Sequence, residues 1–121
     1  MAWEIGNFAL EFDPLSADDM ERLEAAEKAK NDILSKADKE ISWSKQIRLV
    51  CAATRAYFDA LFGDGTSAKL FDGMTDSLRD YMPVVDSFNG YVEQIKADAV
   101  AAAKKYTPKK AAVKKNEEST V

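Results

Sequence analysis

The chain opens with two short runs in which apolar and polar residues alternate. The apolar positions of these runs are Trp3, Ile5, Phe8, Leu10 and Phe12. A period of two places successive side chains on opposite faces of a β-strand. Gly6 and Asn7 stand between the runs, and both residue types tolerate the positive φ of a tight turn. The pattern predicts a β-hairpin with strands over residues 2–5 and 8–12. Because an isolated hairpin is marginal in water, we expect it to pack on helices.

The period changes to that of an α-helix after Pro14. Ser16 followed by Asp19 resembles a capping box and predicts a helix over residues 17–40. Ser42 or Ser44 then caps a second helix over residues 45–62, which has the strongest amphipathic pattern in the chain. Its apolar positions are Ile47, Val50, Cys51, Tyr57, Phe58, Leu61 and Phe62. This second helix is expected to organise the core.

Glycines divide the remaining helical sequence. Gly63 is placed for a left-handed helix end, and a short helix is predicted over residues 67–71 before Gly73. A last long helix is predicted over residues 76–105, with a break or kink near residues 79–83 because Pro83 cannot donate a backbone hydrogen bond. The predicted class is mostly α: an N-terminal β-hairpin packed on a bundle of three main helices plus one short helix.

Charge divides the chain into an acidic domain and a basic tail. Residues 1–103 hold 11 Lys and Arg against 19 Asp and Glu, and residues 104–121 hold six Lys against two Glu. We therefore predict one domain over residues 1–106 and a flexible, disordered Lys-rich tail over residues 107–121. An acidic domain repels nucleic acid, whose binding depends on neutralising phosphates. Weak contact of the tail with RNA or DNA is the remaining route to a nucleic-acid partner.

No residue pattern supplies the chemistry of an enzyme. The chain has no histidine, and its one cysteine, Cys51, cannot form an internal disulfide. Gly63-Asp64-Gly65 resembles phosphatase and calcium-binding loops, but Phe62 occupies the place of the nucleophile and Phe71 that of the closing calcium ligand. We expect no enzyme activity, no metal and no cofactor. The absence of a signal peptide or apolar span predicts a reducing cytoplasm and no membrane contact.

What remains is the surface. Aromatic residues are numerous for a domain with few layers in which to bury them, so we predict an exposed apolar patch or an oligomer interface. The first candidate for partner binding, called here the predicted patch, comprises Tyr57, Phe58, Phe62, Leu70 and Phe71. The alternative is that these residues fill the core, as aromatic side chains at helical spacing usually do.

The same segment carries a resemblance to a known group of proteins. Residues 57–66 are Tyr57-Phe58-Asp59-Ala60-Leu61-Phe62-Gly63-Asp64-Gly65-Thr66, followed by Lys69-Leu70-Phe71-Asp72-Gly73. This stretch resembles short proteins from phages and prophages of Gram-positive bacteria, in which Phe-Phe-Asp-x-x-Phe-Gly-x-Gly-Thr precedes Lys-x-Phe-Gly-Gly. Tyr57 replaces the first Phe of that pattern and Asp72 replaces a Gly. The resemblance spans most of residues 1–110, and its specific part is residues 49–73.

Such proteins are similar to phage tail assembly chaperones in size, acidity and helical character. The resemblance implies a protein of the host bacterial cytoplasm that transiently binds and shields the phage tape-measure protein until tail-tube subunits assemble. It also implies the tail-tube protein as a partner. A second copy of the chain is the partner expected from the predicted oligomer interface. The alternative is a structural virion protein, either a head–tail connector or a minor tail component.

Overall fold

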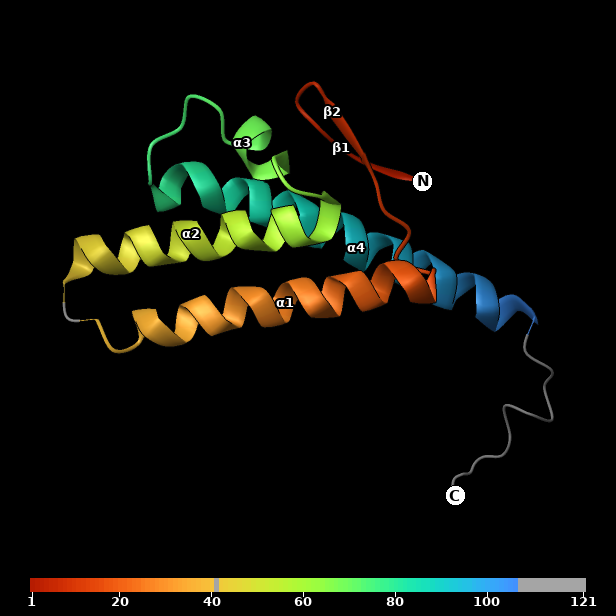
Figure 1. Ribbon diagram of the computed structural model, residues 1–121. Helices are drawn as coiled ribbons and strands as arrows, with labels where there is room; N and C mark the ends of the chain where they lie inside the picture. Colours follow the sequence, from red (N-terminus) through yellow and green to blue (C-terminus); the bar gives the residue numbers. More distant parts are fainter. Residues whose placement is uncertain (41, 107–121) are drawn as a thin grey trace, which may run out of the picture.

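A computed structural model of the chain describes residues 1–40 and 42–106. Within them, a two-stranded hairpin precedes three long helices and one short helix, as Figure 1 shows. The predicted class, mostly α with the hairpin packed on the helices, is confirmed. The predicted tail over residues 107–121 lies outside the described residues.

The hairpin forms where the sequence predicts it, with the second strand one residue shorter than the predicted range 8–12. Strands β1 (Ala2–Ile5) and β2 (Phe8–Glu11) are antiparallel, and Trp3 lies opposite Leu10. Gly6 adopts a φ of +55° in the turn, a conformation that a residue with a Cβ rarely adopts. Phe12 continues the pairing beyond β2, because its N–H donates to the Met1 carbonyl at 3.1 Å.

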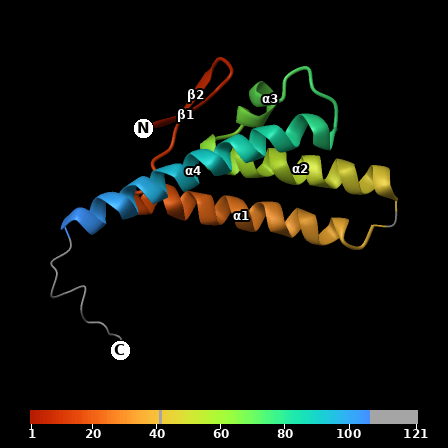
Figure 2. The same ribbon diagram turned by 180° about the vertical axis from the view of Figure 1, so that it is seen from behind.

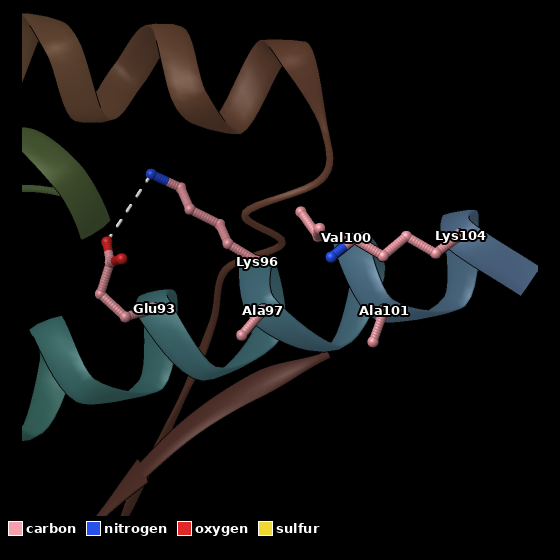
Figure 3. Close-up of a pocket in the computed structure, with 6 residues that line it drawn as sticks. All are labelled: Glu93, Lys96, Ala97, Val100, Ala101 and Lys104. Atoms are coloured by element: carbon pink, nitrogen blue, oxygen red, sulfur yellow. Dashed lines mark ion pairs between the residues drawn. The ribbon is translucent and has the colours of Figure 1, made fainter. Parts of the chain in front are cut away.

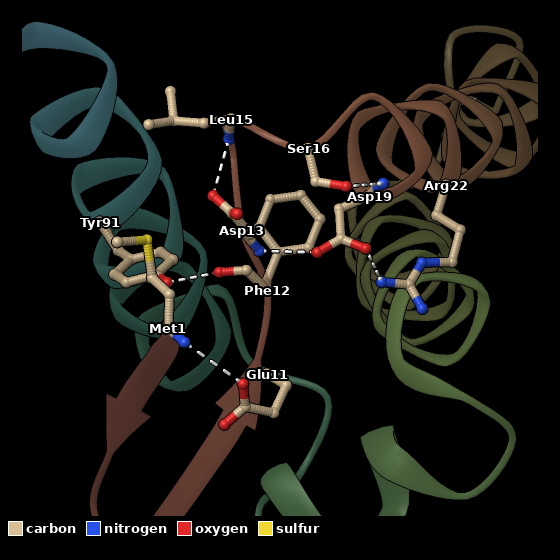
Figure 4. Close-up of polar contacts among 9 residues, drawn as sticks. All are labelled: Met1, Glu11, Phe12, Asp13, Leu15, Ser16, Asp19, Arg22 and Tyr91. Atoms are coloured by element: carbon tan, nitrogen blue, oxygen red, sulfur yellow. Dashed lines mark hydrogen bonds and ion pairs between the residues drawn. The ribbon is translucent and has the colours of Figure 1, made fainter. Parts of the chain in front are cut away.

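Helix α1 (Ala17–Ala37) begins at the predicted cap. The Ser16 hydroxyl accepts a hydrogen bond from the Asp19 N–H at 3.4 Å. The Asp19 carboxylate in turn accepts from the Asp13 N–H at 2.8 Å and pairs with Arg22 at 2.5 Å, so one side chain joins the end of the hairpin to the start of α1 (Figure 4). The helix ends three residues before the predicted boundary at residue 40.

Helix α2 (Trp43–Phe62) runs back antiparallel to α1, and the two form the helical pair seen in Figures 1 and 2. Ser42 is its N-cap, since the hydroxyl accepts from the Lys45 N–H at 3.4 Å. The Gln46 amide donates to the Glu40 carbonyl at 2.5 Å and so closes the turn between the two helices. Helix α2 ends at Gly63, whose φ of +111° carries the chain toward the short helix α3 (Thr66–Leu70).

Helix α4 (Leu78–Tyr106) is continuous through Pro83, so of the predicted break or kink near residues 79–83 the break is absent. Pro83 lies in the second turn of the helix, and because proline has no N–H it cannot donate the intrahelical hydrogen bond of that position. Helix α4 packs against α2 and the first strand. Both views show that its C-terminal end projects beyond the start of α1 (Figures 1 and 2).

The core lies where the hairpin, α2 and α4 meet. Trp3 is 1% exposed and stacks on Phe58, with ring centroids 5.6 Å apart, while Phe88 of α4 meets it edge-on at 5.1 Å. Phe12, also 1% exposed, meets Phe88 edge-on. Aromatic pairs in these arrangements add about 0.5–1.5 kcal/mol each beyond the burial of their area. The hairpin therefore closes the helical layer by inserting two aromatic side chains into it.

Candidate functional site

The predicted patch lies in the core, not on the surface. Tyr57, Phe58, Leu70 and Phe71 are between 0% and 8% exposed, and Phe62 is half-buried. Trp3 covers Phe58 and Phe62 from the hairpin side. The prediction that this patch is exposed is therefore wrong, because the hairpin and α4 supply the missing layer. Because these side chains are buried or half-buried, they form no surface to which a partner could bind in this structure.

Tyr57 shows how completely the patch is enclosed. Its ring is 5% exposed, and the Lys30 ammonium of α1 lies 5.1 Å from the ring centroid on one side. Burial, and secondarily the charge of Glu27, raises the pKa of the Tyr57 phenol well above its ordinary value of 10.0. The hydroxyl therefore stays protonated, and Tyr57 acts as a core residue with a cation packed against its ring.

Cys51 is fully buried in α2. Burial, followed by the negative charge of Asp76, raises the pKa of its thiol above 9.0. A thiol that is buried and protonated is a poor nucleophile and a poor metal ligand. Among the residues that the structure describes, no cluster of three or more His, Cys, Asp or Glu side chains is arranged to hold a metal ion.

A polar cluster joins α2 to the segment before α4 and to the first turn of α4. The Arg55 guanidinium donates to the Asp76 carboxylate at 2.7 Å and to the Tyr81 hydroxyl at 2.8 Å. Arg48 pairs with the other Asp76 oxygen at 3.3 Å, while the Tyr81 ring stacks on Phe71. The cluster fixes the start of α4 against α2. The sequence pattern did not indicate this cluster, although Arg55 falls within the apolar stripe of its helix, where a buried charge needs a partner.

A second polar contact fixes the turn that Gly63-Asp64-Gly65 makes between α2 and α3. The Asp59 carboxylate accepts hydrogen bonds from the N–H and the hydroxyl of Ser67, at 2.8 and 3.0 Å. Both glycines adopt positive φ, +111° at Gly63 and +91° at Gly65. The segment thus works as a helix-to-helix turn, in which one carboxylate caps the short helix α3.

The exposed apolar side chains lie elsewhere. Among the described residues, the large hydrophobic side chains with the greatest exposure are Met1, Leu15, Trp43, Met74 and Val100. Val100 is 58% exposed and belongs to the last two turns of α4, the end of the helix that projects from the body. Leu15 is 57% exposed and lies in the loop before α1, beside α4 in Figure 4.

Val100 belongs to a stripe along one side of that helix end. The stripe, called here the α4 stripe, comprises Glu93, Lys96, Ala97, Val100, Ala101 and Lys104. These side chains, all from α4, line an open hollow of about 440 Å³ (Figure 3). Glu93 and Lys96 form an ion pair at 3.8 Å at the inner end of the stripe. The stripe has an apolar centre and charged ends, an arrangement suited to docking another helix.

Comparison with known proteins places the chain in a family. The model of one protein family, described as a family of unknown function (DUF6673), matches residues 6–118. The chain belongs to DUF6673. No curated protein and no solved structure matches it. The described helices of this DUF6673 chain include none long and apolar enough to cross a membrane.

Proposed function

We propose that this DUF6673 chain is a bacteriophage tail assembly chaperone. In this role it transiently binds and shields the tape-measure protein in the host bacterial cytoplasm, before tail-tube subunits polymerise. The observation that carries the proposal is the α4 stripe: an exposed apolar centre around Val100 on a helix end that projects from the body. The resemblance of residues 49–73 to short phage proteins supplies the identity of the partner.

The chemistry of the stripe suits a helical partner. A tape-measure protein is a long helical rod with apolar stripes, and such a stripe is covered when it packs against a second apolar helix face. Ala97 and Ala101 are small, so a partner helix can approach the axis of α4 closely, and Val100 supplies apolar contact. Lys96 and Lys104 flank the apolar centre and favour acidic residues beside the partner's stripe.

The size of the stripe suits reversible binding. Residues 93–104 span about 18 Å of helix, which is short compared with the interfaces of stable complexes. A chaperone that leaves the finished tail needs a modest affinity per contact. Several copies along one rod then protect it together.

The test is binding of the tape-measure protein encoded by the same phage or prophage. Full-length wild-type chain should retain it in a pull-down at physiological salt. Val100→Asp should weaken binding about tenfold or more, because it places a charge at the centre of the contact. Trp43→Asp is the matched control: it changes a similarly exposed side chain at the start of α2 and should leave binding unchanged. Failure of the wild-type chain to bind would overturn the proposal.

A second measurement separates the chaperone from a structural virion protein. Mass spectrometry of purified particles should lack this chain, because a chaperone leaves before the tail is complete. Its presence at a fixed stoichiometric copy number would instead assign it to the connector or to a minor tail component.

A further inference from the structure

The α4 stripe is complementary to a second copy of itself that runs in the opposite direction. Its outer positions, 93, 97, 100 and 104, are spaced by four, three and four residues, and the spacing is the same from either end. Reversal exchanges Glu93 with Lys104 and Ala97 with Val100. It also exchanges Lys96 with Ala101. The charges at the two ends are therefore opposite, while the centre pairs a small side chain with a larger one.

Such a stripe fits a second copy of itself in antiparallel orientation. Glu93 of each copy would then meet Lys104 of the other, twice over, by the symmetry of the pair. Ala97 would face Val100, so that the methyl groups of valine fill the space that alanine leaves. A parallel arrangement brings Glu93 to Glu93 and Lys104 to Lys104, so the charges select the antiparallel one.

The position of the stripe permits this pairing. Glu93, Ala97, Val100, Ala101 and Lys104 are exposed, and the end of α4 extends beyond the start of α1 (Figures 1 and 2). In an antiparallel pair the two bodies lie at opposite ends of the paired helices. Residues 1–103 of each copy carry a net charge of −8 from 11 basic and 19 acidic residues, so this separation also lowers the repulsion between the copies.

We propose that the α4 stripe pairs with the α4 stripe of a second copy in antiparallel orientation and makes a symmetric, weak homodimer. The pairing is a property of the chain alone and goes beyond the proposed function. Where both operate, the second copy and the helical partner compete for Val100. The dimer is then the state in which the apolar stripe is covered before the partner arrives.

The experiment is sedimentation equilibrium of the purified full-length chain, from micromolar to millimolar concentration. The wild-type chain should shift from monomer to dimer across this range. Glu93→Lys alone and Lys104→Glu alone should each weaken dimerisation about tenfold, because each replaces two attractive contacts by two repulsive ones. An equimolar mixture of these two variants should restore dimerisation to the wild-type level, since each variant then meets a complementary charge.

Two further variants control for folding and for net charge. Asp98→Lys changes the net charge as much as Glu93→Lys does but lies outside the stripe, so its dimerisation should match the wild type. Val100→Asp should abolish the dimer while leaving the helical circular-dichroism signal intact. A wild-type chain that stays monomeric at millimolar concentration would overturn the proposal. So would a mixture of the two charge variants that associates no better than either alone.

Discussion

Trp3, in the first strand, donates a hydrogen bond from its indole Nε1 to the hydroxyl of Ser87 on α4, at 3.0 Å. The two residues are 84 positions apart, and the contact joins the start of the chain to its last helix. A similar bond lies nearby, where the Tyr91 hydroxyl donates to the Phe12 carbonyl (Figure 4). The hairpin is thus attached to α4 at two points, and its aromatic side chains complete the core.

The first prediction concerns the contribution of Trp3 to stability. Trp3→Ala removes a 1% exposed side chain that stacks on Phe58, and it should lower the free energy of unfolding by about 3–5 kcal/mol. Trp43→Ala is the matched control, because Trp43 is 66% exposed and should change stability by less than about 0.5 kcal/mol. Urea denaturation followed by circular dichroism measures both. Equal losses for the two variants would contradict the assigned position of the hairpin.

The second prediction separates core from surface. Phe58→Asp buries an unpaired carboxylate at a site with 0% exposure, so the cooperative thermal transition should be lost. Val100→Asp places the same carboxylate on an exposed helix end and should leave that transition in place. If the Phe58→Asp variant still folded cooperatively, Phe58 would have to be exposed, and the predicted patch would lie on the surface.

The third prediction concerns the turn between α2 and α3. Asp59→Ala removes the acceptor of two hydrogen bonds from Ser67 and should lower the free energy of unfolding by about 1–2 kcal/mol. Asp64→Ala is the control in the same turn, since Asp64 is exposed, and a change within about 0.5 kcal/mol is expected. Chemical denaturation of both variants and of the wild type measures these changes. If Asp59→Ala cost no more stability than Asp64→Ala, the Asp59 carboxylate would not stabilise the turn.

The fourth prediction concerns alkaline pH. The pKa of Tyr57 is raised in the folded protein, chiefly by burial, whereas the unfolded chain titrates near the ordinary value of 10.0. The protonated phenol of Tyr57 therefore contributes to the stability of the folded state in full below pH 10. This contribution is lost as the pH rises further, because the unfolded state then releases the proton while the folded state still holds it. The Tyr57→Phe variant removes this contribution. Its unfolding free energy should fall less between pH 9 and pH 11 than that of the wild type.

Local patterns predicted the elements well. The alternation of residues 3–12 and the pair Gly6-Asn7 indicated the hairpin, and serines indicated the starts of α1 and α2. These signals depend on neighbours in the chain, so they can be interpreted without the fold. Helix ends were less accurate: α1 ends at Ala37, and α4 passes through Pro83 without a break. Packing against α2 and the hairpin compensates for the hydrogen bond that the proline removes.

Which apolar side chains are exposed could not be predicted from the same patterns. Phe58 and Val100 are both apolar positions in helices, yet one has 0% exposure and the other 58%. The difference depends on whether a distant segment covers each side chain. Trp3 covers Phe58, whereas Val100 lies near the C-terminal end of α4, which projects beyond the start of α1. The Arg55–Asp76–Tyr81 cluster likewise unites residues from separate elements.

The sequence by itself determined the class of the fold, because strand and helix periods, caps and turn glycines act over a few residues. The lack of histidine and the difference in charge between residues 1–103 and 104–121 also follow directly from the sequence. Only the tertiary structure decided which apolar residues remain exposed. Exposure depends on which distant layers meet: the hairpin lies over the end of α2 and encloses the predicted patch, while the end of α4 extends past every neighbour among the described residues and leaves its stripe open.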